Sequence, residues 1–265
     1  MRHSLAVILL LTLTACSLLE PLPDGSEPTA LLSAEQLYDQ AKTELNDGNY
    51  STAVTLYEKL QSRYPYGRYA QQALLETAYA NYRQGETEAA VSASDRFIKQ
   101  YPNHPHVDYA YYVKGLANFG GEISLLKSLG GQDPTERDPK AAQESFAAFK
   151  DLVTRFPNSK YAPDSKLRMQ YLLNALAKHE VHVARYYLRR GAHIAAVNRA
   201  QSILTQYPNS PSTRDALEIM VKGYDAMGMT DLRDDARRVL AKNTSAAEAA
   251  AVESKPEKSW WQFWK

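Results

Sequence analysis

Apolar side chains recur at helical spacing along residues 34–64, in two stripes that a turn at Gly48 separates. The stripes consist of Ala34, Leu37, Tyr38, Ala41 and Leu45, followed by Ala53, Leu56, Tyr57, Leu60 and Tyr64. Spacings of three and four residues indicate one apolar face on each of two helices. Pro65 ends the second helix, because proline lacks an N–H group and clashes with the preceding turn. The pattern predicts a helical hairpin that needs neighbours to bury both stripes.

The hairpin pattern recurs along the chain. Gly85 and Pro102 follow Gly48 and Pro65 by the same number of residues, and similar units end at two later prolines. An aromatic residue precedes each of these prolines, in the pairs Tyr64-Pro65, Tyr101-Pro102, Phe156-Pro157 and Tyr207-Pro208. This arrangement matches the tetratricopeptide pattern, which has a period near 34 residues. A fifth unit without a proline is typical of a terminal cap. We therefore predict an all-α fold, an α-solenoid of about five tetratricopeptide-like helical hairpins.

The N-terminus has the pattern of a secretion signal. Residues 1–15 contain a basic start and an apolar run that is shorter than the roughly 20 residues that span a bilayer. The sequence ending at Cys16 resembles a bacterial lipobox, which implies an N-acyl and S-diacylglycerol lipid on Cys16 with fatty acids such as palmitate. Ser17 favours the outer membrane, because an aspartate there would resemble an inner-membrane retention signal. The alternative is an ordinary signal peptide with a coincidental cysteine.

The rest of the chain divides by composition. The expected parts are a lipidated cysteine and flexible tether at 16–33, repeats 1–2 at 34–106, repeats 3–5 at 107–242, an insertion at 118–138 inside the third repeat, and an Ala/Glu/Lys linker with a Trp-rich tail at 243–265. Long loops in compact domains are often functional, although the insertion can equally pack on its own domain. Residues 161–190 predict one long helix, since no breaker interrupts them after Pro163.

Charge and motif content argue against several function classes. The 31 basic and 30 acidic side chains give a net charge of +1, so no global field attracts nucleic acid. His179 and His182 are three residues apart, whereas the zinc-binding HExxH motif needs histidines at i and i+4. The sole cysteine is assigned to the lipid, and no phosphate-binding glycine loop is present. We predict no enzyme, no metal and no cofactor besides the covalent lipid.

Binding is better supported than catalysis. In tetratricopeptide proteins generally, side chains of each first helix line a concave groove. Alignment on Gly48 and Gly85 places six side chains near that groove, namely Tyr38, Lys42, Asn46, Tyr79, Tyr82 and Arg83. Tyr109, Tyr112 and Phe119 follow in the third hairpin. Aromatic and cationic groups suit an extended peptide with aromatic side chains and a terminal carboxylate. The alternative is that half of these tyrosines serve only the packing between repeats.

Several sequence segments resemble those of the BamD family, the lipoproteins of the β-barrel assembly machinery of Gram-negative bacteria. They include NDGNYSTAVTLYEKLQSRYPYGRYAQQ, RFIKQYPNHPHVDYAYYVKGLANF and RGAHIAAVNRAQSILTQYP, and the likeness covers roughly residues 34–242. The resemblance implies a non-enzymatic scaffold, lipid-anchored on the periplasmic face of the outer membrane. It also implies that the C-terminal repeats dock the POTRA region of the insertase BamA and hold BamC and BamE, while the N-terminal repeats recognise unfolded outer-membrane proteins.

The resemblance also assigns two residues by motif. Arg199 in AAVNRA falls on the family's BamA-facing arginine, and Tyr64 in RYPYG falls in a stretch associated with substrate recognition. The alternatives are an intramolecular ion pair for Arg199 and simple packing for Tyr64. Another hypothesis is an envelope protein that acts on peptidoglycan or coordinates peptidoglycan enzymes. A hydrolase would need a carboxylate pair or a metal site in a cleft, and none stands out.

Overall fold

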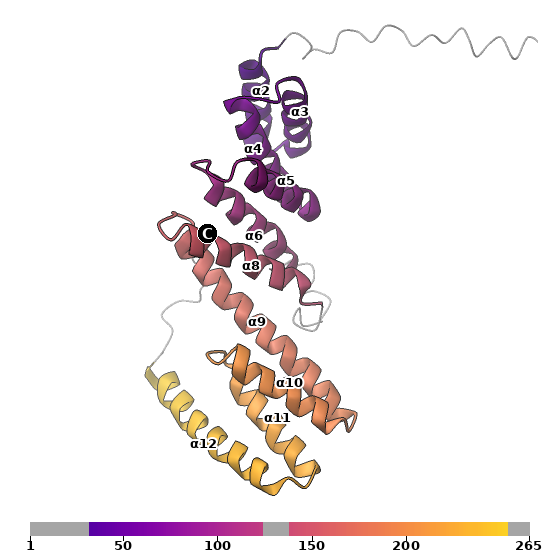
Figure 1. Cartoon of the computed structure of the whole chain (residues 1–265), viewed down its shortest axis with the longest axis vertical. Helices are drawn as coiled ribbons and strands as arrows, with labels where there is room; N and C mark the ends of the chain where they lie inside the picture. Colours follow the sequence, from indigo (N-terminus) through magenta and orange to yellow (C-terminus); the bar gives the residue numbers. More distant parts are fainter. Residues whose placement is uncertain (1–31, 124–137, 254–265) are drawn as a thin grey trace, which may run out of the picture. The chain divides into compact units, whose positions relative to one another are not determined.

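The computed structural model of the chain describes residues 32–123 and 138–253, with the backbone alone at 120–123 and 244–253. Every regular element in these ranges is a helix (Figure 1). The ten helices are α2 (Ala34–Asn46), α3 (Tyr50–Arg63), α4 (Arg68–Gln84), α5 (Thr87–Gln100), α6 (Val107–Ile123), α8 (Lys140–Arg155), α9 (Ala162–Arg189), α10 (His193–Gln206), α11 (Ser212–Ala226) and α12 (Thr230–Glu253). The prediction of an all-α fold built from helical hairpins is confirmed.

Some predicted features fall outside the described residues. They are the signal peptide, the lipidated Cys16, the tether up to residue 31, the insertion between 124 and 137, and the Trp-rich end from 254 onward. In the ranges that are described, no helix combines the length and apolar character that crossing a membrane requires.

Local sequence signals set the helix ends. The Ser33 hydroxyl accepts from the Gln36 N–H at 3.2 Å, and the Gln36 side chain accepts from the Ser33 N–H at 3.0 Å. This reciprocal capping box satisfies two donors that the start of α2 would otherwise leave unpaired. Gly48 follows α2 with a φ of +84°, a conformation that glycine adopts without the steric cost of a Cβ. The corresponding turns after α4, α9 and α11 also contain a glycine with positive φ.

The chain forms two compact units, with a boundary between Ala73 and Leu74. The first unit contains α2, α3 and the start of α4. Its core is formed by fully buried side chains that the apolar stripes predicted, among them Leu37, Tyr57 and Leu60. The two predicted helices of the first hairpin are therefore held together by the residues that defined their pattern.

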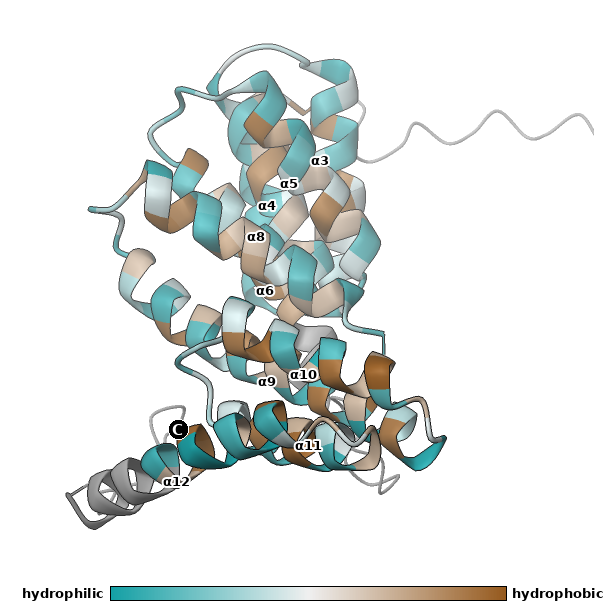
Figure 2. Ribbon diagram, turned by 60° about the horizontal axis from the view of Figure 1, so that its bottom comes forward, coloured by the Kyte–Doolittle hydropathy of each residue, from teal (hydrophilic) through white to brown (hydrophobic). Residues whose placement is uncertain are grey.

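The second unit stacks successive helices from α5 to α12, and α9 also packs against α11. Apolar residues lie on the sides of these helices that face one another (Figure 2). The contact between α6 and α8 is especially close, because a Cβ at Gly115 would lie 2.5 Å from a ring carbon of the fully buried Phe149. Glycine at this position lets the aromatic ring reach the backbone of α6.

Two helices extend beyond the expected boundaries. Helix α6 continues to Ile123, past the residue at which the insertion was expected to begin, because Asn118 and Phe119 are buried in its packing. Helix α12 continues to Glu253, into the expected linker, where alanine and glutamate favour helix. The long helix was predicted well: α9 begins one residue after Tyr161 and contains 28 residues.

Candidate functional site

Five tyrosines of the second unit form a continuous row of ring contacts across α4, α6 and the start of α9. Ring centroids are 6.4 Å apart from Tyr82 to Tyr79 and from Tyr79 to Tyr109. The row continues with 5.3 Å from Tyr109 to Tyr161 and 4.6 Å from Tyr161 to Tyr112, where the rings are stacked. We name these five residues the aromatic ladder. Four of them belong to the predicted groove, and Tyr161 connects the two tyrosines of α6.

The ladder joins the hydrophobic core at one end. Tyr112 lies 6.1 Å from Phe149, which in turn contacts Phe119. Phe119 contacts Tyr171, whose side chain is 38% exposed. The ladder tyrosines are themselves half-buried. Each ring therefore contributes to packing between hairpins and also leaves part of its surface accessible, so packing and binding are not exclusive roles here.

Polar groups hold Tyr112 in place. Its hydroxyl donates to Asp164 Oδ2 at 2.7 Å, and Arg168 Nε donates to the same oxygen at 2.6 Å. Burial raises the pKa of Tyr112, and the hydrogen bond to Asp164 raises it further. Burial likewise raises the pKa of Tyr109, with a contribution from the carboxylate of Glu76. Both phenols are therefore neutral at physiological pH, and each can donate a hydrogen bond.

Cations flank the ladder at two points. Arg83 Nη1 donates to the Tyr79 hydroxyl at 2.6 Å, and its guanidinium carbon lies 5.6 Å from the centroid of the same ring. The ammonium of Lys160 lies 5.0 Å from the Tyr161 centroid. Both cationic side chains are exposed. A surface of aromatic rings with exposed cations can hold aromatic side chains and a carboxylate together.

The predicted groove residue Tyr38 belongs to a separate tyrosine cluster in the first unit. Its ring lies 5.7 Å from Tyr57 and 5.6 Å from Tyr69. The Tyr69 hydroxyl accepts from Arg68 Nη2 at 2.8 Å, and the guanidinium lies over the ring. The cluster has the same ingredients as the aromatic ladder, namely aromatic rings in contact and a neighbouring cation.

Tyr64 has a local structural role. Its hydroxyl donates to the carbonyl of Leu32 at 3.0 Å, which ties the end of α3 to the residue that precedes the α2 cap. The side chain is nevertheless 36% exposed. The packing role that the sequence left open for Tyr64 is therefore present, and its assigned role in recognition stays a prediction.

Arg199 lies in the C-terminal part of the second unit. Its Nη1 is 3.2 Å from Glu180 Oε2, so it forms the intramolecular ion pair that the sequence left open. The side chain is 48% exposed and lines a cavity of about 550 Å³ with Tyr187 and Asn198. Its pairing does not occupy the whole guanidinium surface, which leaves room for a further acidic partner.

Sequence reasoning missed Tyr161 and the Asp164–Arg168 pair. Tyr161 directly precedes α9 in the segment FPNSKYA, but nothing local indicates that its ring stacks on Tyr112 and also contacts Tyr109. In the part of the chain that the structure describes, no group of three or more His, Cys, Asp or Glu side chains is placed to hold a metal ion.

Comparisons with known proteins agree on one family. The model of a family described as "YfiO: Outer membrane lipoprotein" matches residues 32–239. A protein of Neisseria meningitidis named outer membrane protein assembly factor BamD is 44% identical over 261 residues, which cover 98% of each chain. Proteins of the same name from Xylella fastidiosa and Vibrio cholerae are 41% and 35% identical, over 80% and 87% of this chain and 72% and 96% of their own.

Proposed function

The chain belongs to the YfiO family of outer membrane lipoproteins, whose relatives above are named assembly factors rather than enzymes, and on this premise we propose how it works as a scaffold. In the proposal it assembles outer-membrane proteins by holding two kinds of partner. The aromatic ladder receives the aromatic C-terminal segments of unfolded outer-membrane proteins. The C-terminal hairpins dock the POTRA region of the insertase BamA and hold the lipoproteins BamC and BamE.

The observation that carries the substrate role is the aromatic ladder with its two exposed cations. Half-buried rings offer fixed, partly accessible faces on which aromatic side chains of a peptide can pack. Arg83 and Lys160 lie beside the ladder and can pair with a terminal carboxylate. The neutral phenols add no negative charge of their own that would repel that carboxylate. Tyr38 and Tyr64 of the first unit extend the proposal to that unit.

The proposed BamA contact centres on Arg199. The Arg199 side chain is 48% exposed whereas Glu180 is 19% exposed, so the guanidinium can keep its pair with Glu180 and still donate from its exposed side to an acidic group of a partner. The cavity beside it offers a recess for that partner side chain. The lipid on Cys16 would hold the scaffold on the periplasmic face of the outer membrane, close to the insertase, with several acyl chains providing stable anchoring.

The substrate role is tested with a fluorescent peptide that ends in phenylalanine with a free carboxylate. We expect the full-length lipoprotein in detergent to bind this peptide about tenfold more tightly than its C-terminal amide. The double variant Arg83→Gln/Lys160→Gln should lose that preference, because the carboxylate loses its cations while the rings stay in place. A matched variant, Arg237→Gln, removes a cation of α12 and should keep it. Equal preference in all three proteins contradicts the proposed role.

The docking role is tested by affinity purification from detergent extracts with mass spectrometry. Wild-type protein should recover a POTRA-bearing barrel protein and small lipoproteins. Arg199→Glu should lose the barrel protein, and the swapped pair Arg199→Glu/Glu180→Arg should not regain it, since the intramolecular pair returns but the outward charge stays reversed. Full recovery by the swapped pair would reduce Arg199 to an internal role, and recovery of cell-wall enzymes instead would overturn the scaffold proposal.

A further inference from the structure

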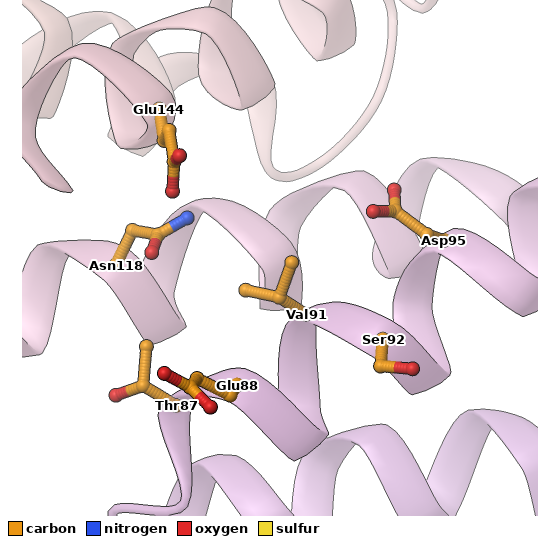
Figure 3. A pocket seen from close by; sticks show the side chains of 7 residues that line it. All are labelled: Thr87, Glu88, Val91, Ser92, Asp95, Asn118 and Glu144. Carbon is orange, nitrogen blue, oxygen red and sulfur yellow. The ribbon is translucent and has the colours of Figure 1, made fainter. Parts of the chain in front are cut away.

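A second surface of the second unit has the features of a binding groove. Two adjoining cavities of about 420 and 260 Å³ lie between α5, α6 and α8 and share Val91, Asp95 and Glu144 in their walls. The larger one falls within the range of ~300–1,000 Å³ that is usual for ligand pockets. Figure 3 shows this cavity with Val91 at its centre and polar side chains around it. We name the two cavities together the acidic groove.

The acidic groove and the aromatic ladder use opposite sides of α6. Tyr111, Lys114 and Asn118 line the groove, whereas Tyr109 and Tyr112 belong to the ladder. Residues of an α-helix are about 100° apart around its axis. The two sets consequently project from α6 on sides that differ by more than a right angle. A ligand of the groove therefore does not occupy the surface proposed for aromatic peptides.

Negative charge dominates the acidic groove. Its carboxylates are those of Glu88 and Asp95 on α5 and of Glu144 and Asp151 on α8, against one lining ammonium, that of Lys114. Lys114 pairs with Asp95 at 2.6 Å. The ammonium of the exposed Lys140 lies 3.9 Å from Glu144, at the outer limit of an ion pair. The groove therefore has more carboxylates than ammonium groups, although the total charge of the chain is close to neutral. This local negative charge favours a basic ligand.

A buried donor in the acidic groove points independently to a ligand. Asn118 is 5% exposed, and its Nδ2 has no hydrogen-bond partner in the described structure. The amide and the carboxylate of Glu144 point toward one another across the cavity (Figure 3). A buried donor without a partner costs about 1–3 kcal/mol relative to a satisfied one. A carbonyl oxygen that enters this space would satisfy Nδ2, and peptide backbones provide such carbonyls.

The carboxylates are spaced regularly along the groove. Glu88 and Asp95 are seven residues apart on α5, and Glu144 and Asp151 are seven apart on α8. Seven residues of α-helix span about 10.5 Å. A polyproline II segment rises about 3.1 Å per residue with three residues per turn, so its side chains at i and i+3 share a face about 9 Å apart. This spacing is close to the ~10.5 Å of helical rise that separates the two carboxylate-bearing residues of each helix.

From these observations we propose that the acidic groove binds an extended segment of a partner protein with two arginines at i and i+3. One arginine lies between Glu88 and Glu144, the other between Asp95 and Asp151, and a main-chain carbonyl accepts from Asn118. Arginine fits better than lysine because its planar fork donates to two carboxylates at once. The proposal does not depend on the substrate or docking roles described above.

The probe is a fluorescein-labelled octapeptide of prolines with arginines at positions three and six, measured by anisotropy with the full-length lipoprotein in detergent. We expect it to bind at least about tenfold more tightly than a peptide with arginines at three and five, or one with glutamines at three and six. The double variant Glu144→Gln/Asp151→Asn should lose about tenfold in affinity. The matched variant Asp47→Asn/Glu58→Gln removes two exposed carboxylates of the first unit and should change affinity less than twofold.

Two further measurements distinguish binding in the acidic groove from non-specific attraction of a basic peptide to the protein surface. Asn118→Leu should lower the affinity for the arginine peptide about fivefold. The melting temperature of the protein should stay the same or rise, because an apolar side chain leaves no unpaired donor. The aromatic-ended peptide should not compete with the arginine peptide. Equal affinity for wild type and Glu144→Gln/Asp151→Asn, no dependence on arginine spacing, or competition between the two peptides would each overturn the proposal.

Discussion

The aromatic ladder and the C-terminal hairpins are built from the same kind of helix pair but are held together differently. The ladder joins hairpins through half-buried rings, with the Tyr112–Asp164 hydrogen bond between α6 and α9. Across the last helices the side-chain links include partly exposed ion pairs over cores of small and aliphatic residues. Examples are Arg185–Asp215 at 2.8 Å and Arg199–Glu180 at 3.2 Å.

This difference separates a fixed surface from an exchangeable one. Close-packed aromatic rings lose many contacts when they move, so they hold their geometry. Exposed ion pairs contribute little individually and are screened by salt, so an arginine there can change partners. A preformed row of rings suits recognition of a recurring peptide signal, whereas exchangeable charges suit docking to a folded partner.

Removing the ring that supports the ladder should have the largest effect. Phe149 is fully buried and contacts Tyr112 and Phe119. We expect Phe149→Ala to lower the free energy of unfolding by about 3–5 kcal/mol, because it removes buried surface and leaves a cavity. Urea unfolding followed by near-ultraviolet circular dichroism measures this. Leu167→Ala, at a side chain that is 73% exposed, is the control and should change stability little. A loss below about 1 kcal/mol for Phe149→Ala would contradict rigid packing of the ladder.

Removing one hydroxyl tests the polar part of the ladder. Tyr112→Phe keeps the ring but deletes the donor to Asp164. Hydrogen bonds to charged groups contribute about 1.5–3 kcal/mol, so we expect a loss of that size in unfolding free energy. Tyr66→Phe, at an 89% exposed side chain, serves as the matched control. Equal stability of the two variants would mean that Arg168 alone satisfies the carboxylate.

Alkaline pH should weaken the ladder before it weakens the ion pairs. Burial raises the pKa of Tyr109 and Tyr112 above the ordinary value of 10.0. Both phenols are protonated in the folded and unfolded chain below pH 10, so their contribution is complete there. Above pH 10 the unfolded chain releases these protons more readily, and stability falls as pH rises toward the folded pKa, by up to ~1.4 kcal/mol per pH unit and tyrosine. Unfolding curves at pH 9, 10 and 11 should show a shallower decline for Tyr109→Phe, and an unchanged slope would argue against burial of Tyr109.

The smallest effect is expected in the C-terminal hairpins. Arg185→Gln should cost less than about 1 kcal/mol, because the ion pair with Asp215 is nearly half-exposed. The difference from wild type should vanish in 1 M salt, where charges are screened within about 3 Å. A double-mutant cycle with Asp215→Asn isolates the pair. If the coupling persists in high salt while the cost of Phe149→Ala shrinks, the comparison between the two regions is reversed.

The sequence predicted which segments are helical more accurately than it predicted where the helix before the insertion ends. The glycine turns, the proline stops and the start of α9 lie where their residues indicated, because each signal acts on its own backbone. Helix α6 extends past its predicted end because Phe119 packs against Phe149 of α8. This contact joins residues that are far apart in the sequence, so local sequence patterns could not predict it. The near-neutral total charge likewise gave no indication of the acidic groove. Its carboxylates lie close together only because α5 and α8 pack around α6.

Periodicity, caps and breakers alone thus determined an all-α chain of hairpins, since these effects operate within a few residues of one another. Tertiary structure decided which tyrosines touch, because Tyr112 and Asp164 meet across 52 residues of chain. It also decided that Arg199 pairs with Glu180, 19 residues away on the preceding helix. Such contacts depend on how closely hairpins approach, and at Gly115 a single missing Cβ sets that distance by admitting the ring of Phe149.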